Sequence, residues 1–370
     1  MIEHTPLDVA QLSPAAQKAL APGPGKMMAS RGMAPLPPAD QLSVLYQITL
    51  DGDQNLAKTA RETAAKLPDS LLAAALVNSA LDRRVIDFFA QLTGNRPNVF
   101  DAIVQNPSIA DETLAVMAGK LGAREVERIA ANEQRMLRHP QIIAAMYMNK
   151  HARMSTVDRA VELAVRNNVR VPGLAAWDEI ARALQSEKLQ ANPEVDALFE
   201  QVVARSLDDT ILTQGDGEQV READEHEQKV LEETKDVPFA DLPIPGQIRL
   251  ATVGDAFTRG LAVRSPIRIV AMSAIKSPAI TEFEAGRYAS NHALSEDVIR
   301  YIASRREFTK QYGTKYALCR NPKTPISESM RLLPFLREKD VVQISKSKGV
   351  PSAVVAQARK LLSQRRGGKA

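Results

Sequence analysis

Apolar residues recur at helical spacing along most of the chain. Leu294, Val298 and Ile302, for example, lie four residues apart. One stripe of such a segment is apolar while the opposite face is charged, which is the pattern of an amphipathic helix. Residues 267–275 are apolar and rich in β-branched side chains, as in many strands. The helical segments on both sides nevertheless favour a buried helix there.

Capping residues mark where these helices begin. Thr281 and Glu284 have the spacing of a capping box, in which a hydroxyl and a carboxylate satisfy two free N–H groups reciprocally. Ser295 precedes two acidic residues, which the helix dipole favours in a first turn. Thr324 followed by Pro325 predicts an N-cap and a first helical residue.

The helix starts recur at a loose period. Pro278 and Pro322 are 44 residues apart, and Pro107 and Lys150, which follow similar asparagines, are 43 apart. Two helices per unit at this spacing are typical of HEAT and armadillo repeats, whose period is about 40 to 47 residues. We therefore expect an all-α protein, an α-α solenoid of degenerate two-helix repeats in two blocks. The alternative is an irregular helical bundle whose helix starts share proline and threonine for general capping reasons.

Composition and charge divide the chain into five segments. We expect a disordered Pro/Ala-rich tail at 1–40, with a short helix over Pro14–Leu20 as an alternative, because this segment holds seven prolines. Helical blocks follow at 41–205 and 244–364, separated by an acidic flexible linker at 206–243, and a basic tail closes the chain at 365–370. Residues 1–236 carry a net charge of −9 and residues 237–370 a net charge of +13. The C-terminal block is therefore expected to meet an acidic partner, unless the two halves attract each other.

The sequence contains no recognised catalytic or metal-binding signature. No two of the five histidines are three or four residues apart, and phosphate-binding loops and nucleophile elbows are absent. Cys319 has no partner for an internal disulfide, and we interpret it as a small buried hydrophobe, with a reactive thiol as the alternative. We expect no enzyme, cofactor or metal. Since the sequence also lacks a bilayer-spanning apolar segment and a signal sequence, we expect no membrane association and a cytoplasmic location.

Basic residues concentrate in the C-terminal block, and aromatic residues interleave with them. Three interpretations are open. The basic residues form a solvated outer face while the aromatic rings turn into the core, or they bind an acidic surface, either of another protein or of the acidic linker. In the third interpretation they bind a nucleic acid. The candidate contacts are Arg300, Arg305, Arg306, Lys310, Lys315, Arg320 and Lys323, with Phe308, Tyr312 and Tyr316 between them.

Two turns of this block resemble units of known repeat families. Asn321-Pro322-Lys323-Thr324-Pro325 before an apolar helix, and Val350-Pro351 followed by Val354 and Ala358-Arg359, resemble leucine-rich-repeat-variant and HEAT-like units. Residues 247–362 are also similar to a group of uncharacterised helical proteins of deltaproteobacteria. The resemblance implies an α-solenoid and implies no reaction. The N-terminal half departs from it, because it lacks the repeated Asn-Pro-x-Thr-Pro form.

These patterns predict a non-enzymatic protein-interaction scaffold or adaptor built on a helical-repeat surface, since such surfaces are long and concave. The alternative is a nucleic-acid-binding module that uses the basic C-terminal block. The position of the basic side chains separates the two hypotheses. A contiguous concave stripe favours nucleic acid, and scattered side chains favour the scaffold.

Overall fold

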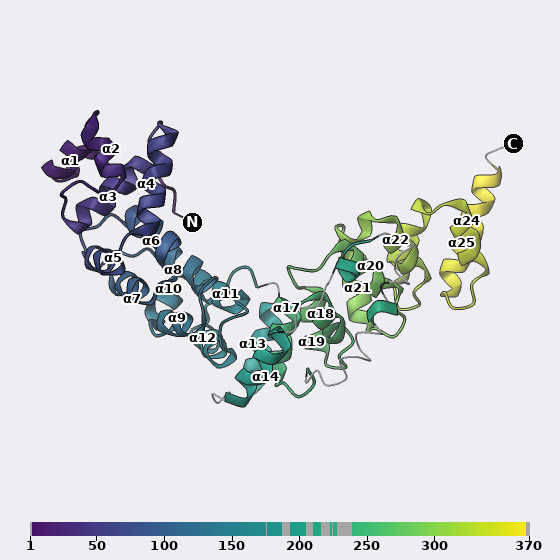
Figure 1. The fold of residues 1–370 in the computed structure, drawn as a ribbon. Helices are drawn as coiled ribbons and strands as arrows, with labels where there is room; N and C mark the ends of the chain where they lie inside the picture. The colour runs from purple at the N-terminus through teal and green to yellow at the C-terminus, as the bar shows by residue number, and fades with distance from the viewer. Residues whose placement is uncertain are drawn as a thin grey trace. The chain divides into compact units, whose positions relative to one another are not determined.

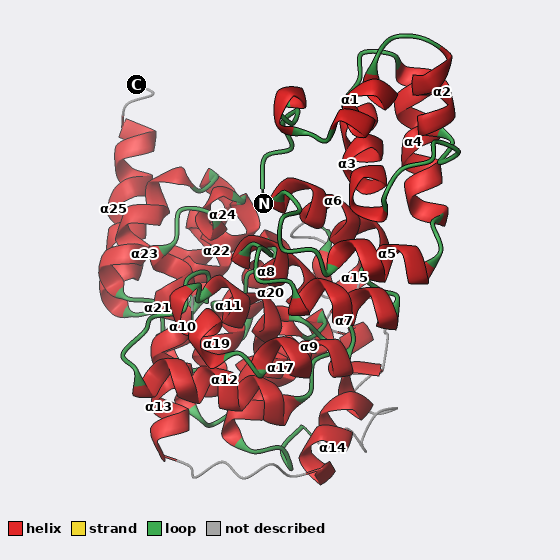
Figure 2. Cartoon of the chain, turned by 90° about the vertical axis from the view of Figure 1, so that its left-hand side faces the viewer, coloured by secondary structure: helices red, strands yellow, loops and turns green. Residues whose placement is uncertain are grey.

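The computed structural model describes residues 2–174, 176–186, 193–204, 210–215, 223, 225–227 and 239–367. Over these residues the chain is all-helical and contains no strand (Figure 1, Figure 2). It divides into two compact units, Met1–Gly173 and Leu174–Ala370. Within the same residues, no helix combines the length and the apolar character needed to cross a membrane.

Short helices make up the first unit. Helices two positions apart in the chain lie side by side: α3 contacts α5, which contacts α7, and α4 contacts α6, which contacts α8. The elements are η1 (Val9–Gln11), α1 (Pro14–Leu20), α2 (Pro24–Ser30), α3 (Pro38–Thr49), α4 (Gln54–Lys66), α5 (Asp69–Leu76), α6 (Arg83–Thr93), α7 (Pro97–Gln105), α8 (Asp111–Ala118), α9 (Ala123–Ala130), α10 (Glu133–Arg138), α11 (Gln141–Met148) and α12 (Met154–Arg166).

The N-terminal segment packs onto this unit, in contrast to the disordered tail expected from its prolines. Pro14 and Pro24 stand in the first turns of α1 and α2, where the missing N–H leaves no helical hydrogen bond unmade. The alternative of a helix over Pro14–Leu20 is confirmed, and this helix contacts α3. Ahead of it, His4 Nε2 lies 3.0 Å from Asp87 Oδ2. Small buried alanines suffice to pack α1 and α2, which a count of prolines does not reveal.

The second unit is built in the same way. Here α17 contacts α19, which contacts α21, and α20 contacts α22, which contacts α24. The elements are α13 (Trp177–Ser186), α14 (Pro193–Ala204), α15 (Thr210–Thr213), α17 (Ile244–Val253), α18 (Ala256–Val263), α19 (Arg268–Ile275), α20 (Glu282–Ser290), α21 (Glu296–Ser304), η2 (Phe308–Lys310), α22 (Tyr312–Arg320), α23 (Ile326–Leu332), η3 (Leu333–Phe335), α24 (Glu338–Lys346) and α25 (Ser352–Gly367).

The division between the units falls earlier than the boundary expected at residue 205. Both α13 and α14 contact α17 of the second unit. Lys276 Nζ lies 2.8 Å from Glu179 Oε1 on α13, and the Arg249 guanidinium lies 4.4 Å from the centre of the Phe199 ring on α14. The amphipathic pattern of α13 and α14 predicts two helices but does not specify which neighbours they pack against.

The segments expected to be a flexible linker and a basic tail also take part in the fold where they are described. Leu212 of α15 is buried against Ala256 and Phe257. The rest of the expected linker, namely residues 206–209, 216–222, 224 and 228–238, lies outside the described residues. At the C-terminus, α25 continues to Gly367, and Arg365 donates hydrogen bonds to the carbonyls that precede α24, those of Pro334 and Leu336.

Most of the predicted helix starts are confirmed. Thr281 and Glu284 form the capping box of α20, and Ser295 caps α21. The apolar run at 267–275 is the buried helix α19. The start predicted at Thr324 is wrong, because the extended backbone of Pro325 (ψ 134°) makes Pro325 the N-cap and α23 begins one residue later.

Three buried asparagines join successive turns. Asn106, Asn149 and Asn321 follow α7, α11 and α22, and each is at most 3% exposed. Each side-chain nitrogen donates to two carbonyls that lie 28–32 residues earlier, at 2.5–3.3 Å. Each side-chain oxygen accepts the N–H two residues further on, which closes an Asx turn. One side chain therefore shapes its own turn and satisfies buried carbonyls of an earlier one.

This offset of 28–32 residues differs from the period of 40–47 residues expected from the prolines. Pro278 and Pro322 follow Ser277 and Asn321, whose side chains bond to earlier carbonyls and to the N–H two residues further on. Between them, Asn291 also closes an Asx turn, with the Ala293 N–H, and this turn carries no proline. The distance between the two prolines therefore spans more than one turn and overestimates the repeat length. The bonded turns themselves are separated by two or three short helices, such as α6 and α7 between residues 78 and 106.

We expect Asn106→Ala to lower the free energy of unfolding by about 2–3 kcal/mol, because it leaves buried carbonyls and one N–H without partners. Urea unfolding of the full chain measures this difference. Asn78→Ala is the control, since Asn78 is exposed and makes the same turn bond, to the Ala80 N–H at 2.9 Å. It should cost about 0.5 kcal/mol or less. Equal losses in both variants would contradict the role assigned to the buried amide.

Candidate functional site

The seven basic residues predicted as contacts fall into three groups. Arg300 pairs with Glu296 on the outer face of α21. Lys323 donates to the carbonyls of Ala293 and Leu294 at 3.2 and 2.5 Å, so it fastens the turn before α21. Both side chains therefore already have partners within the protein.

The second group surrounds η2 and consists of Arg305, Arg306, Lys310 and Lys315, called the η2 group below. The first three are exposed and Lys315 is half-buried. Lys315 Nζ donates to the Lys310 carbonyl at 3.1 Å, which keeps these two lysines together. No acidic side chain pairs with any of the four within the described part of the chain. The η2 group is therefore a local excess of positive charge open to solvent.

The aromatic residues between these cations are engaged with the protein. Phe308 is buried. The Tyr312 hydroxyl donates to the Asp340 carboxylate and accepts the Arg337 N–H at 2.9 Å. Burial, together with the hydrogen bond to Asp340, raises the pKa of Tyr312. Tyr316 donates to Gln343 Oε1 at 2.5 Å. These hydroxyl groups tie α22 to α24, as in the interpretation that turns the aromatic rings towards the core.

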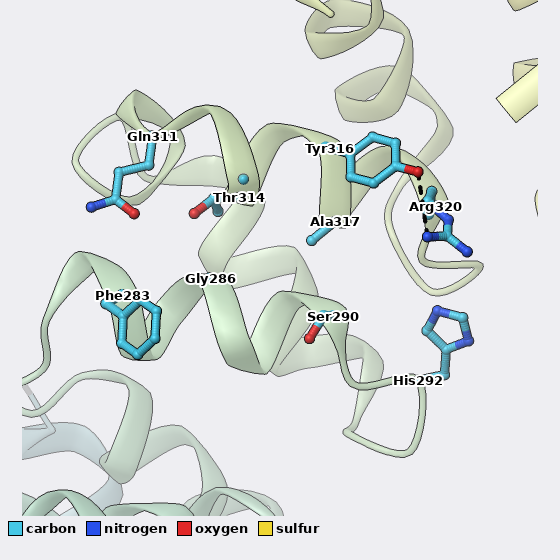
Figure 3. A pocket seen from close by; sticks show the side chains of 10 residues that line it. Phe283, Gly286, Ser290, His292, Gln311, Thr314, Tyr316, Ala317 and Arg320 are labelled. Carbon is cyan, nitrogen blue, oxygen red and sulfur yellow. Dashed lines mark hydrogen bonds between the residues drawn. The ribbon is translucent and has the colours of Figure 1, made fainter. Parts of the chain in front are cut away.

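Arg320 stands apart from the η2 group, at the rim of a pocket between α20 and α22 (Figure 3). Its Nη1 lies 3.4 Å from the Tyr316 hydroxyl, and its guanidinium carbon lies 5.4 Å from the centre of that ring. His292 lines the same pocket from the turn after α20. The structure therefore separates Arg320 from the residues with which the sequence grouped it.

Sequence reasoning missed a buried ionic cluster in the second unit. Arg259 and Glu284 form a two-armed ion pair, with both N–O distances 3.0 Å, and their side chains are 4% and 0% exposed. Glu284 also accepts the Thr281 N–H in the capping box. The capping box was visible in the sequence, but the partner of its carboxylate, 25 residues earlier, was not.

The acidic segment supplies a second buried carboxylate to this cluster. Glu227 pairs with Arg264 at 2.7 Å and with Arg287 at 3.4 Å. Gly260 leaves room for it, because a Cβ there would lie 2.1 Å from Glu227 Oε1. Two nitrogen atoms of Arg287, Nε and Nη1, have no hydrogen-bond partner among the described residues. Part of the predicted attraction between the acidic segment and the basic block is thus present, although its cations are Arg264 and Arg287.

The remaining reactive side chains are few. Cys319 is buried, and burial raises the pKa of its thiol to about 12, in agreement with a packing role. No group of three or more histidine, cysteine or acidic side chains has a metal-binding arrangement in the portion that the structure describes.

Comparison with known proteins adds no relative, since no family model, curated protein or solved structure matches the chain.

We expect Glu284→Gln to lower the free energy of unfolding by about 3 kcal/mol or more, because it leaves the Arg259 guanidinium buried without a counter-charge. Urea unfolding followed by circular dichroism measures the loss. The matched control is Glu296→Gln, which breaks the exposed pair with Arg300 and should cost about 0.5 kcal/mol or less. A loss for Glu284→Gln as small as that of the control would show that the buried pair contributes little.

Proposed function

We propose that the protein is a non-enzymatic adaptor built on helical repeats, and that its second unit binds an acidic protein partner. The repeated asparagine turn supports the repeat architecture, because in both units a buried asparagine amide donates to the carbonyls of an earlier turn. Short helices stacked in pairs contact mainly their neighbours in the chain, as in α-solenoids. We keep the similarity of residues 247–362 to the deltaproteobacterial helical proteins, and the cytoplasmic location, as hypotheses within this proposal.

The η2 group is the observation that carries the choice of partner. Some exposed cations of the second unit have acidic partners: Arg268 pairs with Asp297, and Arg331 pairs with Glu328. The four cations of the η2 group lie close together in the chain around a single acidic residue, Glu307, and none of them forms an ion pair in the described residues. Unpaired charge of one sign attracts a partner of the opposite sign and speeds its association. An acidic protein surface meets this requirement.

A nucleic acid is the rival partner. Phosphates would also be attracted to the η2 group, but single-stranded binding gains much of its affinity from bases stacked on free aromatic rings. Phe308 is buried, and the hydroxyl groups of Tyr312 and Tyr316 are held by α24. Phe335, whose ring centre lies 5.7 Å from Lys315 Nζ, is exposed, and it is the ring on which a base would stack. The held tyrosines favour a protein partner over a single-stranded nucleic acid.

The test compares a glutamate-rich peptide with duplex DNA. We expect the peptide to bind the full chain and to lose about tenfold or more in affinity when Arg305, Arg306, Lys310 and Lys315 are all changed to Ala, because the attracting charge is removed. Fluorescence anisotropy of the labelled peptide measures this loss. The control changes Arg268, Arg300 and Arg331 to Ala, which lowers the net charge by a similar amount at paired positions and should leave the affinity within about twofold.

Two results would contradict the proposal. One is equal peptide affinity in the wild type and the fourfold variant. The other is duplex DNA binding at physiological salt that disappears in the fourfold variant. In that second case the slope of log affinity against log salt, about −0.9 per phosphate contact, would flatten by several units, and the nucleic-acid alternative would replace the adaptor.

A further inference from the structure

A pocket of about 360 Å³ opens between α20 and α22 of the second unit (Figure 3). This volume is in the range of small-molecule sites. Figure 3 shows Arg320, Tyr316 and His292 at one end of the pocket and Phe283 and Gln311 at the other. The remaining lining residues are Gly286, Ser290, Gly313, Thr314 and Ala317.

A glycine and an unsatisfied hydroxyl lie on the facing walls. A Cβ at Gly286 would lie 2.9 Å from Thr314 Oγ1, so glycine lets α20 and α22 approach this closely beside the pocket. Thr314 is 1% exposed, and its hydroxyl has no hydrogen-bond partner in the described residues. A buried hydroxyl without a partner destabilises the free protein. A ligand with an oxygen or nitrogen atom at this point would satisfy it.

The charge of the lining selects for an anion. None of the ten lining residues is acidic, and Arg320 is exposed at the rim. Tyr316 positions this cation, because its hydroxyl is held by Gln343 on α24 and lies 3.4 Å from Arg320 Nη1. Ala317 in the middle of the pocket and Phe283 at the other end present apolar surface (Figure 3). The pocket therefore combines one cationic end with an apolar body.

We propose that this pocket binds a carboxylate joined to an apolar or aromatic group, with the carboxylate at Arg320 and a polar atom of the ligand at the Thr314 hydroxyl. The carboxylate belongs to a free organic acid or to an acidic side chain of a bound peptide. The peptide source rests on the proposed adaptor function, whereas binding of a free acid does not.

Calorimetry and NMR titration of the full chain with 3-phenylpropionate test the proposal, with 3-phenylpropionamide as the uncharged control. We expect the acid to bind and the amide to bind about tenfold or more weakly, since hydrogen bonds to charged groups are the stronger ones. A second pair of probes, short peptides that carry Phe-Glu or Phe-Gln, distinguishes the source. Binding of the acid alone assigns a free organic acid, and binding of the glutamate peptide assigns a protein ligand. The proposal is overturned if neither the acid nor the glutamate peptide binds, or if each binds no better than its uncharged counterpart.

Three variants locate the site. Arg320→Gln should weaken binding about tenfold or more, while Arg300→Gln, which alters a paired arginine outside the pocket, should not. Gly286→Ala should weaken binding, because the added Cβ displaces Thr314, and its control is Gly349→Ala, where an added Cβ meets nothing within 4 Å. The fourfold η2 variant should bind 3-phenylpropionate like the wild type, so failure of the pocket and failure of the proposed function are separate results.

Thr314→Val gives the sharpest readout, because it replaces the unsatisfied hydroxyl by a methyl group of similar size. We expect the free protein to melt at a higher temperature and the ligand to bind up to about tenfold more weakly. A merely structural hydroxyl would change stability without changing affinity. Unchanged affinity in both Thr314→Val and Arg320→Gln would overturn the proposal even if the acid binds elsewhere on the chain.

Discussion

The hydrogen bonds from a buried asparagine amide to the carbonyls of an earlier turn are the interactions on which both units depend. Short helices have many ends, and each end leaves carbonyls without helical partners. At Asn106, Asn149 and Asn321 one side chain satisfies two such carbonyls and closes its own turn. Ser277 does part of the same work, since its hydroxyl donates to the Thr252 carbonyl at 2.8 Å. Arginine side chains satisfy carbonyls at other helix ends. Arg96, for example, donates to the Leu67 carbonyl at 2.8 Å. Polar side chains therefore connect helices whose apolar stripes are too short to hold them alone.

In the second unit, buried ion pairs occur in addition to these hydrogen bonds to helix ends. Arg259 and Glu284 satisfy each other at the base of α20, and Glu227 brings the acidic segment against Arg264 and Arg287. Along the next turns of α20, Gly286 and the unsatisfied Thr314 hydroxyl open the pocket on the side that faces α22. The satisfied carboxylate of Glu284 on α20 and the unsatisfied hydroxyl of Thr314 on the facing helix α22 thus lie in the same unit, and the proposed ligand would satisfy the hydroxyl. The η2 group follows α21, and its unpaired charge is the surface that we propose for a larger partner.

The sequence predicted those parts of the fold that depend on interactions between residues close together in the chain. The capping box of Thr281 and Glu284, the cap at Ser295 and the helix over 267–275 each depend on residues within one or two turns, and all three are confirmed. Contacts 25 to 60 residues apart were not predictable, because the partners of Glu284 and Glu227 carry no sequence mark that links them. The charge asymmetry correctly predicted that the basic block attracts the acidic segment. The cations that pair with Glu227 are Arg264 and Arg287, which were not among the candidates. Of the seven candidate contacts, the structure keeps four together. The pocket could not be predicted, because nothing in the sequence links Gly286 to Thr314, 28 residues later.

Selective nitrogen labelling of the asparagine side chains tests the central interaction most directly. NMR of the labelled full chain measures the hydrogen exchange of each side-chain amide and its proximity to other residues. The role assigned to these asparagines predicts slow exchange for Asn106, Asn149 and Asn321, with nuclear Overhauser contacts to residues 28–32 positions earlier, and fast exchange for the exposed Asn78. Side-chain amides of the three buried asparagines that exchange as fast as that of Asn78, without those contacts, would contradict it.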